Sequence, residues 1–325
     1  MTEITLALPF SLPPPELAPD LAKALKAPAL AALLSRTAHS TRNTSEEREL
    51  PHERWLAQAL GVKGFGGSTM RALGQDPADG RWFLLHPAHI EIARSHLLLN
   101  DLRRLQLDEG HARALFDAAC PYFAEIGLTL VYGNAGTWFL RADAWIDMQT
   151  ASPDAAAGLN LNDWMPTGKS AVAYRRLQNE IQMLWFEHPA NGEREAAGLR
   201  PVNAFWPWSP APASDTPTLS ASNVPAWLHD LAQQHPARFA QHQGGLHVCG
   251  ALAAAAIAGD WGRWIAEMHQ LEEHWFAPML AALKAGTLER AHLVLAGRDS
   301  LAEFTTTRLA QRKFWRRPTL DALKP

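Results

Sequence analysis

Three polar residues in the middle of the chain have the types and the spacing of an anion-binding group. His188, Asn191 and Arg194 follow one another at intervals of three. Such intervals place side chains on one side of any helical turn that continues past Pro189. A guanidinium can hold a carboxylate or phosphate through two parallel hydrogen bonds, and an amide can orient the bound group.

A second group follows shortly after the first. Asn203, Trp206 and Trp208 lie on a strand-like segment, whose alternation puts the two tryptophans on one face. If both groups pack together, an arginine, amides and indoles meet in a pocket for a small anionic ligand with a flat or apolar part. In the alternative interpretation, Arg194 pairs with a local acid, the amides cap chain ends, and the indoles fill the core.

The helix expected at 169–187 leads into these groups and contributes two further amides. Its period predicts one buried apolar stripe, formed by Ala173, Leu177, Ile181 and Leu184. Asn179 and Gln182 lie with Arg175 on a second face, where amides are not chosen for helix propensity. We expect both amides to hydrogen-bond either a neighbouring loop or the ligand.

Other motifs suggest metal or phosphate chemistry but are incomplete. Residues 235–249 contain three histidines and a cysteine in a spacing that matches no standard zinc site. The segment 269–274 holds two histidines and two glutamates, but each known helical metal motif fails by one position. Gly168, Lys169 and Ser170 end like a phosphate-binding loop, but Asp163 replaces its first glycine, so a plain helix start is favoured.

Composition excludes several classes of protein. The 325 residues carry 30 basic and 33 acidic side chains, a net charge of −3, which argues against a globally basic nucleic-acid binder. The basic and aromatic tail at 312–317 is therefore interpreted as a docked terminus. Two cysteines cannot form a disulfide framework and suit a reducing compartment. With no targeting or membrane-spanning pattern recognised, we expect a cytoplasmic protein that does not associate with membranes.

Strand-like and helical segments alternate along the chain, which predicts an α/β fold. Strands are predicted at 4–8, 81–85, 128–132, 137–140, 201–208 and 292–296. Helices are predicted at 17–34, 52–60, 108–126, 169–187, 225–234, 246–258 and 261–285. Residues 37–50 and 61–74 are predicted to be loops, and 209–222 a linker.

Several sequence blocks carry a resemblance to known proteins. They are Arg81–His89, the helix segment Leu177–Leu184, the stretch His188–Glu195, the stretch Gly198–Trp208 and the terminal Phe314–Arg316. Together they resemble the RpfE-type regulatory proteins of bacteria, over a match from about residue 50 to the end. The central block is also similar to a segment of archaeal-type, cofactor-independent phosphoglycerate mutases, of the alkaline-phosphatase-like superfamily. The resemblance implies a mostly parallel sheet flanked by helices, at 1–80 and 188–325, with an inserted α+β lobe at 81–187.

The chain departs from the mutases where their chemistry resides. Such enzymes hold two divalent metals, such as Mn or Zn, with a first strand that ends in Asp-Gly and a late strand that ends in Asp-His. Here the corresponding positions read Leu8-Pro9-Phe10 and Ala296-Gly297-Arg298. Without carboxylate and imidazole ligands, a two-metal clamp cannot neutralise a transferring phosphoryl group. Arg298 would supply a fixed positive charge instead of a metal.

The sequence thus predicts a catalytically degenerate mutase-like protein that acts by binding, in regulation, without a cofactor. Its ligand-binding residues would be Asn179, Gln182, His188, Asn191, Arg194, Asn203, Trp206 and Trp208, and its partner a small anionic ligand or a protein. An alternative is a metal-dependent phosphotransferase with ligands relocated to His235, His242, His247, Asp260 and Asp299. A second alternative is a scaffold for protein–protein interaction.

Overall fold

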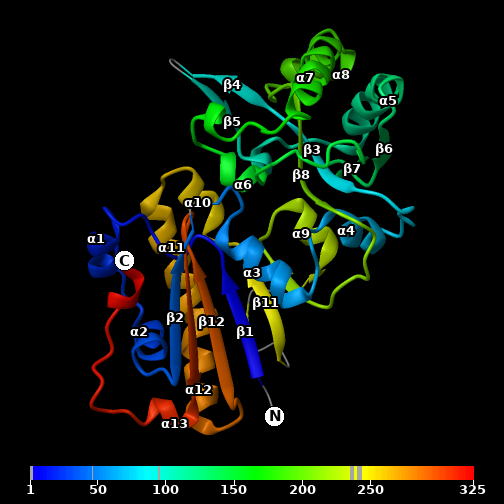
Figure 1. The fold of residues 1–325 in the computed structure, drawn as a ribbon. Coiled ribbons are helices and arrows are strands. Elements are labelled where there is room, and N and C mark those ends of the chain that lie inside the picture. The colour runs from blue at the N-terminus through cyan, green and yellow to red at the C-terminus, as the bar shows by residue number, and fades with distance from the viewer. Residues whose placement is uncertain (1–2, 46, 94–95, 235–237, 240–243) are drawn as a thin grey trace. The chain divides into compact units, whose positions relative to one another are not determined.

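The computed structural model describes residues 3–45, 47–93, 96–234, 238–239 and 244–325 and divides the chain into two compact units. The first unit contains Met1–Trp55, Thr218–Val224 and Ala232–Pro325, and the second contains Leu56–Pro217 and Pro225–Leu231. Figure 1 shows the elements of both. No helix within the described ranges is long and apolar enough to cross a membrane.

The first unit is built on a sheet of seven strands in the order β10-β9-β11-β1-β12-β13-β2. Strand β13 runs antiparallel to β12 and β2 on either side of it, and the other described pairs of this sheet are parallel. The strands are β1 (Glu3–Leu8), β2 (His39–Thr44), β9 (Ser220–Ser222), β10 (Gln233–Gln234), β11 (Gly245–Cys249), β12 (Arg290–Ala296) and β13 (Ser300–Thr307).

Strand β1 is at the centre of this sheet because its side chains are apolar enough to be buried on both faces. Leu6 pairs with His247 of β11 on one side and with Leu293 of β12 on the other. The helices of this unit are α1 (Ala18–Ala24), α2 (Pro28–Ser35), α10 (Ala253–Ile257), α11 (Trp261–Leu271), a π-helical turn η4 (Glu272–Phe276), α12 (Ala277–Ala285), α13 (Arg308–Gln311) and the turn η5 (Asp321–Leu323). Helix α3 (Pro51–Leu60) begins in this unit.

The second unit has an antiparallel sheet in the order β6-β7-β3-β8, formed by β6 (Thr129–Tyr132), β7 (Trp138–Arg141), β3 (Trp82–Ala88) and β8 (Ala204–Ala211). A separate hairpin joins β4 (Ile90–Ile92) to β5 (Leu97–Leu99). The helices are α4 (Gly66–Ala72), α5 (Glu109–Glu125), α6 (Pro153–Ala156), α7 (Ala171–Phe186), α8 (Pro189–Ala196), α9 (Ala226–Leu231) and the turns η1 (Leu102–Arg104) and η2 (Leu161–Asp163). The two faces of its sheet pack against different helices.

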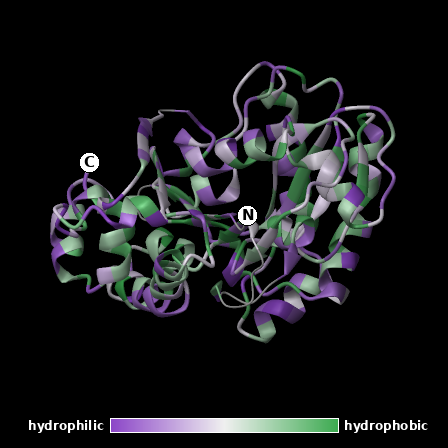
Figure 2. Ribbon diagram, turned by 90° about the horizontal axis from the view of Figure 1, so that it is seen from below, coloured by the Kyte–Doolittle hydropathy of each residue, from purple (hydrophilic) through white to green (hydrophobic). Residues whose placement is uncertain are grey.

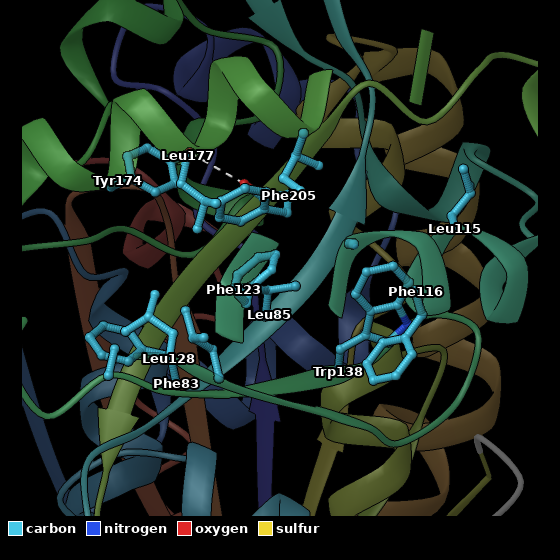
Figure 3. Close-up of a cluster of buried hydrophobic side chains, with 14 of the residues drawn as sticks. Phe83, Leu85, Leu115, Phe116, Phe123, Leu128, Trp138, Tyr174, Leu177 and Phe205 are labelled. Atoms are coloured by element: carbon cyan, nitrogen blue, oxygen red, sulfur yellow. Dashed lines mark hydrogen bonds between the residues drawn. The ribbon is translucent and has the colours of Figure 1, made fainter. Parts of the chain in front are cut away.

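Helices α5 and α7 cover one face of this sheet through a single apolar cluster. Leu115 and Phe116 of α5, and Tyr174 and Leu177 of α7, meet Phe205 of β8 and its neighbours. Figure 3 shows these side chains, with the Tyr174 hydroxyl donating to the Phe205 carbonyl oxygen. In Figure 2 the helices carry both hydrophilic and hydrophobic stretches, as expected of helices that cover a sheet on one side only.

Aromatic side chains fill the opposite face. Phe65, at the start of α4, contacts Trp208 of β8 and Trp227 of α9, with ring centroids 6.3 and 4.6 Å away. The two indoles meet at 5.1 Å with their planes nearly perpendicular. Helix α4 approaches the sheet closely because it begins with glycines: a Cβ on Gly66 would lie 2.0 Å from the Trp82 carbonyl oxygen.

The predicted α/β class is confirmed, with a mostly parallel sheet flanked by helices and an α+β lobe inserted into the chain. The helix predicted at 108–126 is α5, whose first turn is capped by Asp108. The hairpin predicted at 128–140 is β6–β7.

Four local predictions were wrong. The predicted linker at 209–222 contains the end of β8 and strand β9. Residues 37–50 contain the edge strand β2, whose side chains are all exposed and so show no apolar alternation. Residues 61–74 contain helix α4, whose glycines serve close packing rather than a loop. Residues 246–249 form a buried strand within the predicted helical block, because a short apolar run suits either element. The lobe is also wider than the predicted 81–187, since β8 pairs with β3 and so belongs to it.

Candidate functional site

Arg194 is fully buried, and its guanidinium links three backbone carbonyl groups. Its Nη2 donates to the carbonyl oxygens of Leu105, at 2.6 Å, and Arg200, at 2.8 Å. Its Nη1 donates to Gln106 at 3.1 Å, and Nε donates to Arg200 at 3.0 Å. These contacts join helix α8 to two irregular segments of the second unit. They give the buried charge a structural use that needs no anion.

The asparagines of the same block also bond to the backbone. Asn191 donates to the carbonyl oxygens of Trp185 and Val202 and accepts the Val202 N–H, each at 2.8 Å. Asn203 accepts the Ile90 N–H at 2.7 Å and donates to the Ile90 carbonyl oxygen at 2.8 Å. His188 caps α8, and its Nδ1 accepts the Ala190 N–H at 3.2 Å. The chain ends and turns around α8 are thus held by side chains.

The two tryptophans share a face of β8, as their spacing predicted, but this face is turned away from Arg194. Trp206 and Trp208 lie opposite His86 and Leu84 of β3 and are buried on the side of α4 and α9. Leu105, which accepts from Arg194, belongs to the cluster on the side of α5 and α7. The structure therefore does not bring the arginine and the indoles together in the predicted single pocket, because the sheet lies between them.

On α7, the buried amide side chain that hydrogen-bonds to the backbone is that of Gln178, and not that of Asn179 or Gln182, which the sequence singled out. Asn179 and Gln182 are exposed, whereas Gln178 is buried. Gln178 donates to the Asn203 carbonyl oxygen at 3.3 Å and accepts the Phe205 N–H at 3.1 Å. Its spacing with Tyr174, Ile181 and Trp185 is that of a core position, and this pattern could have identified it from the sequence.

A different group of side chains gathers where the parallel strands of the first unit end. In parallel α/β sheets, ligands bind outside the carboxyl ends of the strands. Phe10 follows β1 there in a left-handed conformation with φ of 59°, which is unusual for a bulky residue. Its ring lies 5.9 Å from that of His52, and the Arg298 guanidinium carbon lies 5.5 Å from its centroid. We call Phe10, His52 and Arg298 the strand-end cluster.

The backbone under this cluster is firmly held. The Trp264 indole donates to the Phe10 carbonyl oxygen at 2.9 Å. The Ser11 hydroxyl donates to the Leu8 carbonyl oxygen at 2.6 Å and accepts the Ala296 N–H at 3.2 Å, which joins the ends of β1 and β12. These bonds stabilise the left-handed turn at Phe10 and the position of the chain leading to Arg298.

The ends of β9 and β11 carry a buried polar group. The Ser222 hydroxyl and His247 Nε2 are 2.9 Å apart, and the His247 ring lies 4.7 Å from that of Trp275. Burial raises the pKa of the Cys249 thiol on the same strand as His247, so the thiolate is disfavoured at neutral pH. This cysteine is therefore poorly suited to act as a nucleophile.

The residues proposed as relocated metal ligands have separate local roles. Asp260 caps α11 by accepting the Arg263 N–H at 2.9 Å, and Asp299 is exposed in the turn between β12 and β13. His247 is bonded to Ser222, while His235 and His242 lie outside the described residues. Across the ranges that the structure describes, no three His, Cys, Asp or Glu side chains are arranged to hold a metal ion. The three proposed ligands that the structure describes, His247, Asp260 and Asp299, lie in different local surroundings.

Carboxylate side chains occupy the starts of α7 and α2. Asp147 accepts the N–H groups of Lys169 and Ser170, at 2.5 and 3.3 Å, at the start of α7. Glu272 accepts the N–H groups of Ala29 and Leu30, at 2.6 and 3.0 Å, in the first turn of α2. A carboxylate thus takes the place that an anion would take at a helix N-terminus.

Comparisons with known proteins find a short sequence match and similar solved structures. A 71-residue segment is 31% identical to a 2,3-bisphosphoglycerate-independent phosphoglycerate mutase of Methanothrix thermoacetophila, and it covers 22% of this chain and 18% of that enzyme. The PH0037 protein of Pyrococcus horikoshii has a similar structure, with a TM-score of 0.52 and 9% identity over 94% of this chain and 87% of that one. This chain and the PH0037 protein share a fold. No family model matches the sequence.

A cofactor-independent phosphoglycerate mutase of Thermoplasma acidophilum is also matched in structure. It has a TM-score of 0.43 and 16% identity over 94% of this chain and 90% of that chain. The sequence match spans less than a fifth of the Methanothrix enzyme. The mutase activity of that enzyme therefore applies to this chain only as a proposal, and the likeness to RpfE-type proteins rests on the sequence blocks alone.

Proposed function

We propose that the protein is a catalytically degenerate relative of cofactor-independent phosphoglycerate mutases, with an alkaline-phosphatase-like core, and that it acts by binding a small phosphorylated or carboxylated anion. One observation carries the proposal: Phe10 and Arg298 stand at the ends of the two central strands. These are the places where the resemblance to the mutases implies an Asp-Gly and an Asp-His.

Arg298 suits an anion but not a metal. Its guanidinium carries a permanent positive charge and a planar set of donors that matches phosphate and carboxylate oxygens. The adjacent Phe10 ring attracts the guanidinium through its π face and limits its orientations. A cation fixed here attracts a phosphorylated molecule to the edge where α/β proteins bind ligands, but it repels a divalent metal.

Phosphoryl transfer needs more than a positive charge at this position. Two-metal enzymes place both ions so that the attacking and leaving oxygens are stabilised together. One arginine binds a phosphate without activating a nucleophile. Binding without turnover is therefore the expected activity, and the resemblance to RpfE-type bacterial proteins favours a regulatory use of it.

The competing function is a working metal-dependent mutase with relocated ligands. It would draw on His247, Asp260 and Asp299 together with His235 and His242. The local hydrogen bonds of His247 and Asp260 weigh against it, since they lie in different parts of the first unit, and Asp299 is exposed in the turn between β12 and β13.

The experiment is a calorimetric titration of the purified protein with 3-phosphoglycerate, with inorganic phosphate as a second probe. We expect binding that weakens at least tenfold in Arg298→Ala and is partly restored in Arg298→Lys, since lysine keeps the charge but loses the planar donors. The matched control is Arg317→Ala, which removes an exposed arginine from the C-terminal tail of the same unit. Equal affinity in wild type and Arg298→Ala would refute the proposed site.

A further inference from the structure

Helix α7 has a second face that the fold leaves exposed. Its inner face packs Tyr174, Leu177 and Ile181 into the apolar cluster of the second unit. On the opposite side, Val172, Met183 and Phe186 are 68%, 75% and 84% exposed. Single exposed apolar residues are ordinary on a protein surface, but three on one face of one helix indicate an interaction surface.

The exposed residues follow the spacing of a helix–helix seam. Val172, Arg176, Asn179, Met183 and Phe186 recur at intervals of four, three, four and three, and all five are exposed. This repeat of 3.5 residues keeps a row of side chains directed at a partner helix along the whole contact. We call these five residues the outer face of α7.

The two ends of the outer face lie symmetrically about Asn179. Val172 and Phe186 each lie seven residues from it, which is two helical turns in either direction. Arg176 and Gln182, both exposed, likewise lie three residues away on either side. An antiparallel copy of the same helix would therefore place Asn179 against Asn179, and Phe186 against Val172, around a two-fold axis. Such a self-complementary arrangement is what an isologous dimer requires.

Charge along the helix is complementary in the same antiparallel sense. Lys169, Arg175 and Arg176 lie just before or in the N-terminal half of α7, and Glu180 and Glu187 lie in its C-terminal half or just after it, all of them exposed or half-buried. Within one copy, Arg176 Nε also pairs with Glu180 Oε1 at 3.1 Å. Two antiparallel copies bring the basic half of one against the acidic half of the other. Parallel copies would bring like charges together, which disfavours that alignment.

From this geometry we infer that the outer face of α7 is the contact between two copies of this chain, packed antiparallel with Asn179 at the two-fold axis. A second copy is favoured over an unrelated protein because both the apolar spacing and the charges are complementary to themselves. Asn179 then takes the role of a buried amide that selects one alignment of the helices at some cost in affinity. Gln182, three residues on from Asn179, faces Arg176 of the second copy.

The first test is sedimentation equilibrium of the full chain at about 1–200 μM, since a single helix pair makes a small interface that dissociates at low concentration. We expect a monomer–dimer equilibrium whose dissociation constant rises at least tenfold in Phe186→Asp. Phe314→Asp is the matched control, because Phe314 is 81% exposed in the first unit. A monomer throughout this range, or an equal effect of both substitutions, would overturn the inference.

Charge reversal tests the self-complementarity directly. Replacing Arg175 and Arg176 with Glu makes the outer side of the helix acidic, and replacing Glu180 and Glu187 with Lys makes it basic. Each variant alone should dimerise at least tenfold more weakly than wild type, and an equimolar mixture should form a heterodimer. A mixture that stays monomeric under conditions where wild type dimerises would contradict the pairing.

The alignment has its own test. Asn179→Cys should form a disulfide-linked dimer on mild oxidation, because antiparallel packing brings the two positions 179 together. Glu193→Cys, which is exposed on the next helix, is the control and should remain monomeric. Cross-linking of the control alone would show that the copies meet through a different surface.

Discussion

Arg194 and Arg298 show how one residue type serves two regions differently. Arg194 is buried in the second unit, and its guanidinium donates to the carbonyl oxygens of Leu105, Gln106 and Arg200. Arg298 is half-buried at the end of β12 in the first unit, against the ring of Phe10. Arg194 supplies the hydrogen-bond donors for the backbone carbonyl groups around it. Arg298 lies at the carboxyl ends of the strands, where ligands bind in folds of this class.

This difference explains why a motif that resembles a binding site can be structural. His188, Asn191 and Arg194 have the types and spacing of an anion site, yet each bonds to backbone groups around α8. A buried turn with many carbonyl groups needs donors as much as an anion does. The strand-end cluster has fewer polar residues, but it lies at the carboxyl ends of two parallel strands.

The largest expected effect separates the two arginines by stability. Arg194→Met leaves buried carbonyl groups without donors, so we expect a loss of about 3–5 kcal/mol in the free energy of unfolding. Arg298→Met changes a half-buried side chain that contacts the Phe10 ring, and it should cost clearly less. Urea denaturation followed by tryptophan fluorescence measures both. Similar losses in the two variants would remove the distinction between the regions.

The apolar cluster next to Arg194 provides a second comparison. Ile181 is fully buried, so Ile181→Ala should cost about 2–5 kcal/mol through lost transfer energy and the cavity that remains. Leu184 packs against the same cluster but is only partly buried, and Leu184→Ala should cost clearly less. The same denaturation experiment ranks the two, and the reverse order would be inconsistent with the described faces of α7.

Two glutamines on α7 test the assignment of its faces by a smaller effect. Gln178→Leu leaves the Phe205 N–H and the Asn203 carbonyl group unpaired and should cost about 1–3 kcal/mol. Gln182→Leu changes an exposed position and should alter the stability of the monomer by about 0.5 kcal/mol or less. Measurement at low micromolar concentration keeps association from contributing.

His86 gives the second unit a dependence on pH. Burial lowers the pKa of this imidazole below its usual value, although a hydrogen bond to the Gly136 carbonyl oxygen opposes the shift. As pH falls below about 6.5, the unfolded chain takes up a proton that the folded state resists, so stability decreases. His86→Gln should reduce this loss between about pH 7.5 and 5. An unchanged pH profile would show that other groups cause it.

Sequence reasoning predicted the elements that have a clear apolar period and missed those that do not. Helix α5 and the hairpin β6–β7 follow from their patterns and from the cap at Asp108. Strand β2 escaped because an edge strand exposed on both faces has no apolar alternation, and α4 escaped because its glycines serve close packing.

The candidate site shows the same limit. Sequence identified Arg298 and the residue after β1 as departures from the mutase pattern, but not that they lie together, since their contact depends on the pairing of β1 with β12. It singled out Asn179 and Gln182 and missed Gln178. The predicted buried stripe ran through Ala173 and Leu184, whereas the structure buries Tyr174 and Trp185 on the inner face. Residue types predict possible chemistry, but the pairing of the strands and the orientation of the helices decide which side chains meet.

The most direct test of the central claim is a phosphoglycerate mutase assay of the purified chain with 3-phosphoglycerate under saturating Mn²⁺, with the metal content of the same sample determined by elemental analysis. If the strand-end cluster binds an anion without a two-metal centre, the protein should show no turnover above a heat-treated control and no stoichiometric metal. Turnover that requires two bound metal ions per chain would contradict the proposed loss of catalysis.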